Sequence, residues 1–130
     1  MKNLLVLDFG SQYTQLIARR VREIGVHSIL LPGDASLEEI AERNPAAIIL
    51  SGGPRSVTDD SALQLPERFF DQCQKLQIPV LGICYGLQLI VASLNGAVEK
   101  ASATGEYGRT EITVDTSSLL FQGILILQFI

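Results

Sequence analysis

Residues 80–88 read Val-Leu-Gly-Ile-Cys-Tyr-Gly-Leu-Gln, an apolar run that stops at a cysteine between two glycines. The run predicts a buried strand over residues 78–83, and a helix is expected to follow over residues 85–94. Glycine at positions 82 and 86 indicates a turn too sharp for side chains. A nucleophile elbow has the pattern glycine, any residue, nucleophile, any residue, glycine, and here cysteine takes the place of serine. The stretch therefore predicts that Cys84 is lifted above the edge of a sheet.

Outward from this stretch, short apolar runs alternate with longer amphipathic ones. Further strands are predicted at residues 4–7, 26–31 and 46–50, each followed by a helix or a polar loop. Strands threaded through helices in this way are typical of a parallel sheet that is covered on both faces. The expected fold class is α/β, a flavodoxin-like three-layer open sheet, mostly parallel, with helices on both faces and incomplete at the C-terminus. We expect residues 1–130 to form a single domain.

The ends of the helices carry their own signals. Ser11 is expected to cap a first helix whose apolar positions are Leu16, Ile17, Val21 and Ile24, and Gly25 to end it. Ser36, with Glu39 three residues later, predicts a capping box for a short helix through Arg43. A further helix over about residues 66–76 is expected to direct four side chains inward: Phe69, Phe70, Cys73 and Leu76.

Beyond residue 96 the pattern is less regular. Ala97 and Val98 are expected to pair at a sheet edge, and residues 110–114 alternate like a half-exposed strand. Residues 56–61 read as a polar loop. Residues 125–130 form an uncharged apolar tail, which would be an aggregation hazard unless it is paired or buried.

Composition limits the class of partner. The 130 residues carry a formal net charge of -4, which argues against nucleic acid or an anionic membrane as a partner. The basic cluster Arg19, Arg20 and Arg22 is expected on the solvent-exposed face of a helix. Two cysteines cannot make a disulfide framework or a four-ligand zinc site, so we expect no metal and a reducing cytoplasm. The apolar run at residues 4–7 is too short for a signal-peptide core or a membrane span.

Unusual residues follow three of the predicted strands, at residues 8–11, 51–54 and 82–86. Ligands of open α/β sheets bind outside the carboxyl ends of the strands, so these loops predict one site. A sulfur at the start of a helix is favoured as the thiolate, which makes Cys84 the candidate nucleophile. The backbone N–H of Tyr85 and that of Gly53 are placed to stabilise an oxyanion. Gly52 lets bare backbone approach the substrate.

Plainer interpretations compete with this one. A cysteine at a strand end is most often a small buried hydrophobe. The glycines around Cys84 and the Ser-Gly-Gly-Pro loop favour the nucleophile, whereas Cys73 lacks both features and is expected in the core. Residues 51–56 could instead cradle a phosphate, but they lack the lysine of a Walker A motif and Pro54 removes a donor.

Residues 82–88, Gly-Ile-Cys-Tyr-Gly-Leu-Gln, together with residues 50–54, Leu-Ser-Gly-Gly-Pro, resemble a class I glutamine amidotransferase domain. The resemblance is narrowed to the GMP synthase branch by two features: the tyrosine after the cysteine, and residues 7–22, which read Leu-Asp-Phe-Gly-Ser-Gln-Tyr-Thr-Gln-Leu-Ile-Ala-Arg-Arg-Val-Arg. The resemblance implies that Cys84 attacks the side-chain amide of glutamine, that Gly53 and Tyr85 form the oxyanion hole, and that Gln88 helps to hold the substrate. It also implies that the ammonia passes to a synthetase domain, absent here, which uses ATP and magnesium to aminate XMP to GMP.

A catalytic cysteine needs a base, normally a histidine oriented by a carboxylate. The resemblance puts both in a His-Pro-Glu segment beyond residue 130, while His27 is expected at the opposite edge of the sheet. The sequence therefore predicts an amidotransferase domain, truncated before its catalytic histidine and glutamate, with little or no turnover and no cofactor of its own, and without its synthetase and dimerisation domains. Two alternatives stay open: a non-catalytic fragment that binds a synthetase partner, and another cysteine hydrolase with a base such as Glu106.

Overall fold

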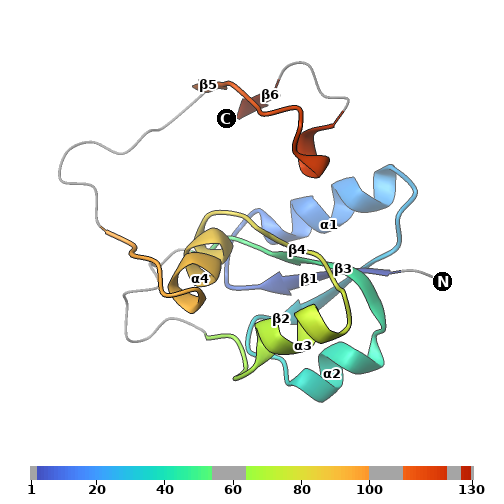
Figure 1. The fold of residues 1–130 in the computed structure, drawn as a ribbon. Helices are drawn as coiled ribbons and strands as arrows, with labels where there is room; N and C mark the ends of the chain where they lie inside the picture. The colour runs from blue at the N-terminus through green and yellow to red at the C-terminus, as the bar shows by residue number, and fades with distance from the viewer. Residues whose placement is uncertain (1–2, 54–63, 100–109, 123–126, 130) are drawn as a thin grey trace. The chain divides into compact units, whose positions relative to one another are not determined.

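The structure is a computed structural model that describes residues 3–53, 64–99, 110–122 and 127–129. The chain divides into two compact units, Met1–Val98 and Glu99–Ile130, which are described separately (Figure 1). The predicted polar loop at residues 56–61 lies outside the described residues, as does Glu106.

The first unit is built on a four-stranded parallel sheet. Its strands are β1 (Asn3–Asp8), β2 (Ser28–Pro32), β3 (Pro45–Leu50) and β4 (Val80–Gly82), in the order β2-β1-β3-β4. All four predicted strands are present, although β4 is shorter than residues 78–83. Parallel pairing brings all four carboxyl ends to one edge of the sheet, which is where the three unusual loops begin.

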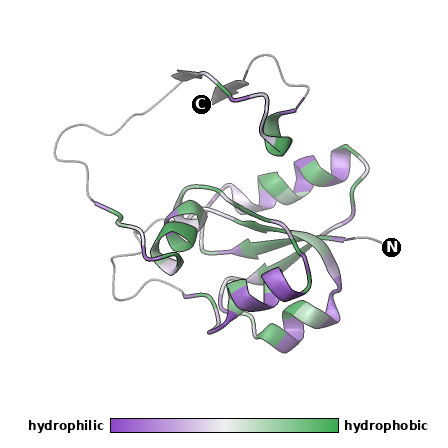
Figure 2. Cartoon of the chain, viewed as in Figure 1, coloured by the Kyte–Doolittle hydropathy of each residue, from purple (hydrophilic) through white to green (hydrophobic). Residues whose placement is uncertain are grey.

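Four helices in the described part of this unit pack around the sheet: α1 (Thr14–Glu23), α2 (Leu37–Glu42), α3 (Phe69–Lys75) and α4 (Tyr85–Ser93). Helix α1 covers one face of the sheet, and α2 and α3 cover the other (Figure 1). Hydrophobic colour follows the strands, whereas α1, α2 and α3 show both colours (Figure 2). This arrangement confirms the predicted flavodoxin-like α/β class, because strands buried on both faces must be apolar throughout.

Most of the core lies around β1 and β3. Leu5, Leu7 and Leu50 have no exposed surface, and Ile48 is almost as deeply buried. The helices and the turns add the rest of the cluster: Phe9, Ala35, Ile40, Phe69, Cys73, Tyr85 and Leu89. Tyr85 and Leu89 belong to α4, so the helix that follows Cys84 is anchored in this core.

The start of α1 differs from the prediction. Ser11 does not cap the helix: its hydroxyl accepts a hydrogen bond from the Tyr13 backbone N–H, and the cap position is Tyr13 itself, whose side chain makes no capping bond. Gly10, at φ 93°, adds a turn that delays the helix to Thr14. Leu16 and Ile24, at 44% and 79% exposed, face outward. At the other end, Gly25 takes φ 86° and ends the helix as predicted.

Helix α2 has the predicted capping box. The Glu39 backbone N–H donates to the Ser36 hydroxyl, and the Ser36 backbone N–H donates to the Glu39 carboxylate. Helix α3 begins at Phe69, later than residue 66, because Arg68 takes a left-handed conformation at φ 65°. Phe69 and Cys73 point inward and Phe70 is partly buried, but the prediction for Leu76 was wrong, since it lies past the helix end and is exposed.

In the second unit, β5 (Thr110–Ile112) pairs antiparallel with β6 (Leu127–Phe129), and a short 3-10 helix, η1 (Leu119–Phe121), lies between them in sequence. The strand expected over residues 110–114 is therefore confirmed, although it ends at Ile112. Part of the apolar tail is paired in β6, which was the condition for avoiding the aggregation hazard. Edge pairing by Ala97 and Val98 was wrong, because both lie outside every strand.

Candidate active site

The turn between β4 and α4 is a strained elbow centred on Cys84. Its backbone has φ 54° and ψ −113°, a conformation that side-chain-bearing residues rarely adopt. A β-carbon added at Gly82 would lie 2.7 Å from the Gly86 carbonyl carbon, and one added at Gly86 would overlap the Leu50 carbonyl oxygen. Both glycines are therefore required for the close packing, as the sequence predicted.

The two cysteines lie in opposite environments. Cys84 is exposed, whereas Cys73 is 5% exposed within the core. Burial raises the pKa of the Cys73 thiol to about 11, because the thiolate would lose its hydration there. The prediction that Cys84 stands at the surface and Cys73 packs inside is confirmed. Cys84 is therefore the accessible thiol of the chain.

The loop after β3 lies directly beside Cys84. A β-carbon added at Gly52 would lie 3.3 Å from the Cys84 β-carbon, and one added at Gly53 would lie 2.7 Å from the Phe9 carbonyl oxygen. Only glycine leaves room for the backbone at Gly53, so the peptide groups there are not covered by side chains of their own. The rest of the loop that could alternatively have bound a phosphate, Pro54 to Ser56, lies outside the described residues.

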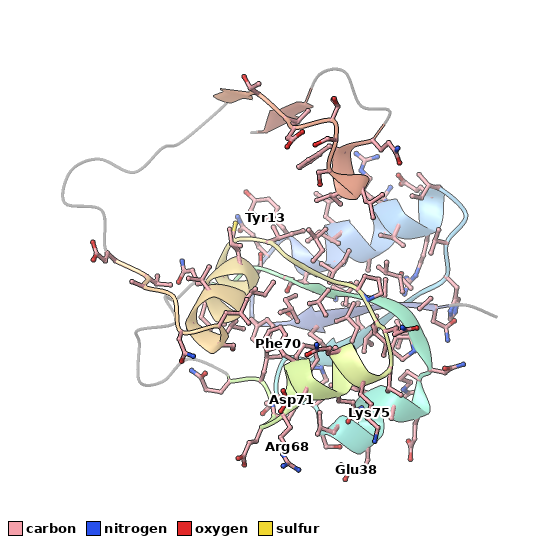
Figure 3. The ribbon with its side chains drawn as sticks, viewed as in Figure 1. Tyr13, Glu38, Arg68, Phe70, Asp71 and Lys75 are labelled. Atoms are coloured by element: carbon pink, nitrogen blue, oxygen red, sulfur yellow. The ribbon has the colours of Figure 1, made fainter. Side chains whose placement is uncertain are left out.

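A pocket of about 350 Å³ joins the three loops at the carboxyl edge of the sheet. Its described lining is Gly10, Ser11, Gln12, Tyr13, Gly52, Gly53 and Cys84. The sequence predicted this convergence but missed Gln12 and Tyr13, because it placed residues 12 and 13 inside the first helix. Tyr13 is 58% exposed and stands out from the start of α1 (Figure 3). The signal that could have found it is Gly10, whose positive φ prolongs the loop.

A larger cavity, about 550 Å³, lies between α2 and α3. Its described lining includes Arg68, Asp71 and Lys75 (Figure 3) but no cysteine. Cavity size alone would therefore point to the wrong place. The exposed thiol makes the smaller pocket the candidate active site.

Tyr85 and Gln88 follow the cysteine on α4. The Tyr85 side chain is buried, with its ring centroid 5.2 Å from that of Phe9, so what Tyr85 offers near the thiol is its backbone. Gln88 is half-buried, and its backbone N–H donates to the Cys84 carbonyl at 3.2 Å. Gln88 therefore lies one helical turn beyond the cysteine, as predicted.

A buried polar cluster lies behind the pocket, and the sequence reasoning missed it. The Thr14 and Ser51 hydroxyls are 2.9 Å apart and have no exposed surface. The Thr14 hydroxyl donates to a carboxylate oxygen of Asp8 at 3.0 Å, and the Ser51 hydroxyl also lies 2.8 Å from the Leu7 carbonyl oxygen. The available signal was Asp8 and Ser51, two polar residues directly after neighbouring apolar strands.

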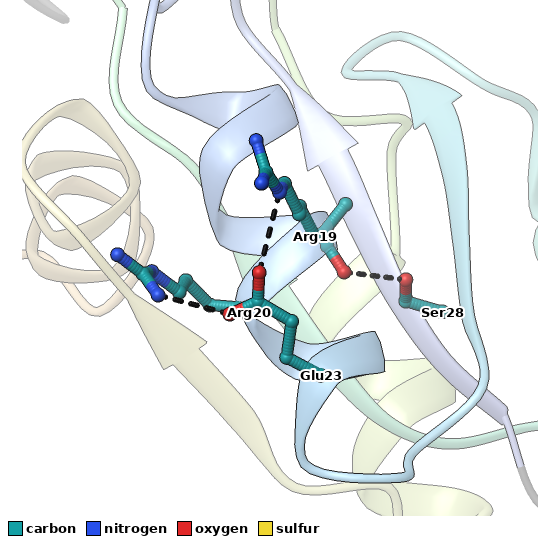
Figure 4. Close-up of polar contacts among 5 residues, drawn as sticks. Arg19, Arg20, Glu23 and Ser28 are labelled. Carbon is teal, nitrogen blue, oxygen red and sulfur yellow. Dashed lines mark hydrogen bonds and ion pairs between the residues drawn. The ribbon is translucent and has the colours of Figure 1, made fainter.

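The remaining charged candidates lie elsewhere. His27 precedes β2, and its Nδ1 lies 2.8 Å from the side-chain oxygen of Asn3 at the start of β1, so it belongs to the edge opposite Cys84. Glu23 pairs with Arg19 at 3.2 Å and with Arg20 at 2.9 Å on the outside of α1 (Figure 4). His27 was predicted at that edge, and Arg19 and Arg20 were predicted on the solvent-exposed face of a helix; none of them is part of the described lining of the pocket.

Within the described ranges, no three His, Cys, Asp or Glu side chains gather in a way that could hold a metal ion. No helix in the same ranges is both long enough and apolar enough to span a lipid bilayer.

Comparison with known proteins agrees with this geometry. Residues 5–126 match the family described as glutamine amidotransferase class-I. GMP synthase [glutamine-hydrolyzing] of Lactobacillus acidophilus is 54% identical over 128 residues, and that of Chlorobium phaeovibrioides is 55% identical over 127 residues. These matches cover 98% and 95% of this chain but 24% of each relative, so the chain spans about a quarter of their length.

A solved structure supports the fold. The crystal structure of a protein from Thermoplasma acidophilum, described as one subunit of a GMP synthase, superimposes with a TM-score of 0.70 at 27% identity. The match covers 97% of this chain and 61% of that one. With a family match over almost the whole sequence, this chain belongs to the class I glutamine amidotransferases.

Proposed function

We propose that this chain is the glutamine-hydrolysing part of a GMP synthase, and that Cys84 is its nucleophile. The observation that carries the proposal is the exposed residue Cys84 on a strained elbow, with the bare backbone of Gly52 and Gly53 beside it. An elbow of this kind presents a nucleophile at the start of a helix, where peptide N–H groups favour negative charge.

The reaction proposed is hydrolysis of an amide through a thioester. The Cys84 thiolate bonds to the side-chain carbonyl carbon of glutamine, and the π pair moves onto oxygen. The N–H groups of Gly53 and Tyr85 stabilise that oxyanion, which is the largest single contribution in many acyl transfers. The oxyanion then re-forms the carbonyl as the C–N bond breaks, and the amide nitrogen takes up the proton that the thiol lost and leaves as ammonia. Water adds to the thioester carbonyl and the C–S bond breaks, which gives glutamate and the free Cys84 thiol. Gln88 and Gly52 are proposed to hold the substrate.

The base that takes the thiol proton is not His27, which lies at the opposite edge of the sheet. The described lining of the pocket contains no histidine, aspartate or glutamate beside Cys84. We therefore expect one round of thiol chemistry to be faster than repeated turnover. For the same reason a second candidate function is a chain that occupies a synthetase partner without releasing ammonia.

The relatives' names support a wider proposal about the product. Ammonia from glutamine would pass to a synthetase that uses ATP and magnesium to aminate XMP, and that synthetase would be the protein partner. The amidotransferase part would need no cofactor of its own. Two cysteines that remain free thiols fit a reducing cytoplasm.

The test is labelling with a chloroketone analogue of glutamine, followed by peptide mapping and by an ammonia assay of the same sample. We expect one adduct, at Cys84, which free glutamine slows by competition, and ammonia release that stays close to the level of a Cys84→Ser control. An adduct at Cys73, or no protection by glutamine, would refute the assignment of Cys84. Full turnover by this chain would refute the expectation that repeated turnover is slow.

A further inference from the structure

A chain of polar contacts connects the surface of the molecule to the residue before the Gly52–Gly53 loop. The Asp8 carboxylate accepts from the Gly10 backbone N–H at 2.8 Å and lies 3.0 Å from the Thr14 hydroxyl. Thr14 lies 2.9 Å from the Ser51 hydroxyl, which is 2.8 Å from the Leu7 carbonyl. The contacts thus link the end of β1, the start of α1 and the end of β3.

Ser51 is the anchor of the loop that follows it. Both its backbone N–H and its hydroxyl are directed to the Leu7 carbonyl, at 3.1 Å and 2.8 Å. Gly52 and Gly53 have no side chains with which to fix their own position. The Leu7 carbonyl already accepts from the Ser51 N–H, so the single proton of the Ser51 hydroxyl can be donated to Thr14, whose own proton goes to Asp8. Because buried hydroxyls are tolerated only when they are bonded, this Ser51–Thr14–Asp8 series holds one arrangement of the backbone at this point.

The same turn also touches the opposite side of the pocket. The Phe9 carbonyl oxygen leaves no room for a β-carbon at Gly53, while the Phe9 ring packs on the Tyr85 ring at 5.2 Å. Phe9 and Tyr85 are both buried. One turn, residues 8–14, is therefore in contact with both residues whose N–H groups are proposed as oxyanion donors.

We propose that Thr14 is a positioning residue: through Ser51 it sets the Gly52–Gly53 loop at the distance from Cys84 that an oxyanion requires. This inference rests on the proposed function. Thr14 touches no substrate, because it has no exposed surface. Its removal should slow reactions in which an oxyanion forms and leave other reactions of the thiol unchanged.

Two reagents separate these effects. With the chloroketone analogue of glutamine, sulfur bonds to the carbonyl carbon, the π pair moves to oxygen, and the pair returns as sulfur shifts to the next carbon and chloride leaves. With iodoacetamide, sulfur displaces iodide directly and no oxyanion forms. Thr14→Val keeps the shape and removes the hydroxyl, and Thr14→Ser restores it. Ser51→Ala removes the partner.

We expect Thr14→Val and Ser51→Ala to lower the second-order rate constant for the chloroketone by about tenfold to a hundredfold, since a misplaced donor costs that much. The iodoacetamide rate should stay within about twofold, and Thr14→Ser should recover most of the chloroketone rate. Thermal unfolding of each variant is measured alongside.

The inference is overturned if the unsubstituted chain prefers the chloroketone but Thr14→Val changes neither rate, or lowers both equally. It is also overturned if Thr14→Val and Ser51→Ala both fail to fold, because the pair would then serve the fold rather than the loop. If the unsubstituted chain itself shows no glutamine-protected adduct at Cys84, the proposed function fails, and the inference fails with it.

Discussion

The sharpest test of the elbow is Gly86→Ala, because two opposing effects meet at this position. In an ordinary helix, alanine in place of glycine stabilises by about 1 kcal/mol. Here the new β-carbon would overlap the Leu50 carbonyl oxygen and lie 2.6 Å from the Leu50 β-carbon. Leu50 has no exposed surface and lies in β3, which is paired on both sides, so it cannot move away.

Overpacking against backbone costs about 3 kcal/mol, at the upper end of the usual range. Subtracting the gain in helix propensity leaves a net loss of about 2 kcal/mol in the free energy of unfolding. Urea unfolding followed by far-ultraviolet circular dichroism should show the midpoint lowered by about 1 M. The matched control is Ser93→Ala, at the exposed end of the same helix, which should be neutral or slightly stabilising. Equal or greater stability of Gly86→Ala would refute the packing argument.

Two further predictions concern residues outside the pocket. The pKa of the Cys73 thiol rises from 9.0 to about 11 in the fold, so its share of the stability is complete below pH 9 and is lost as pH rises toward about 11. That contribution to the free energy of unfolding is on the order of 2 kcal/mol. Urea unfolding of the Cys73→Val variant over the same pH interval should not show this loss of stability. A variant whose stability depends on pH as that of the unsubstituted chain does would contradict the assignment. Ser36→Ala removes the capping box of α2 and should lower stability by about 1 kcal/mol, whereas Ser36→Asp should lose less; equal losses would contradict the role of the cap.

The features predicted correctly from sequence are those set by neighbours along the chain. Alternating apolar runs locate the strands, Ser36 and Glu39 cap α2 within one turn, and Gly82 and Gly86 mark the elbow. The pattern that identifies each feature spans only a few positions, even where, as at Gly86, the contact that requires it is made with Leu50 in β3. A local pattern is therefore enough to locate these features.

The errors arise where distant residues interact. Thr14 is buried beside Ser51, which lies 37 positions away, so α1 turns a polar residue toward the sheet at this point. The apolar Leu16 and Ile24 are left outside, although helical spacing favoured them as core positions. The pairing of β5 with β6 likewise joins segments that no local pattern connects. A hydrophobic pattern cannot reveal the Thr14–Ser51 hydroxyl pair. This pair lies next to the Gly52–Gly53 loop of the candidate active site.

The backbone of Cys84 gives a final test of why the elbow exists. Its φ of 54° and ψ of −113° fall outside the left-handed helical region, which costs about 1–3 kcal/mol for a residue with a β-carbon. Cys84→Gly relieves that strain but adds freedom to the unfolded chain, whereas Cys84→Ala keeps the strain. Cys84→Gly should therefore be more stable than Cys84→Ala by about 1 kcal/mol, the reverse of the order expected for Ser93→Gly and Ser93→Ala in the same helix. Urea unfolding of the four variants measures both differences. If alanine is the more stable residue at both positions, the elbow stores no strain, and its geometry needs no explanation from the chemistry of the thiol.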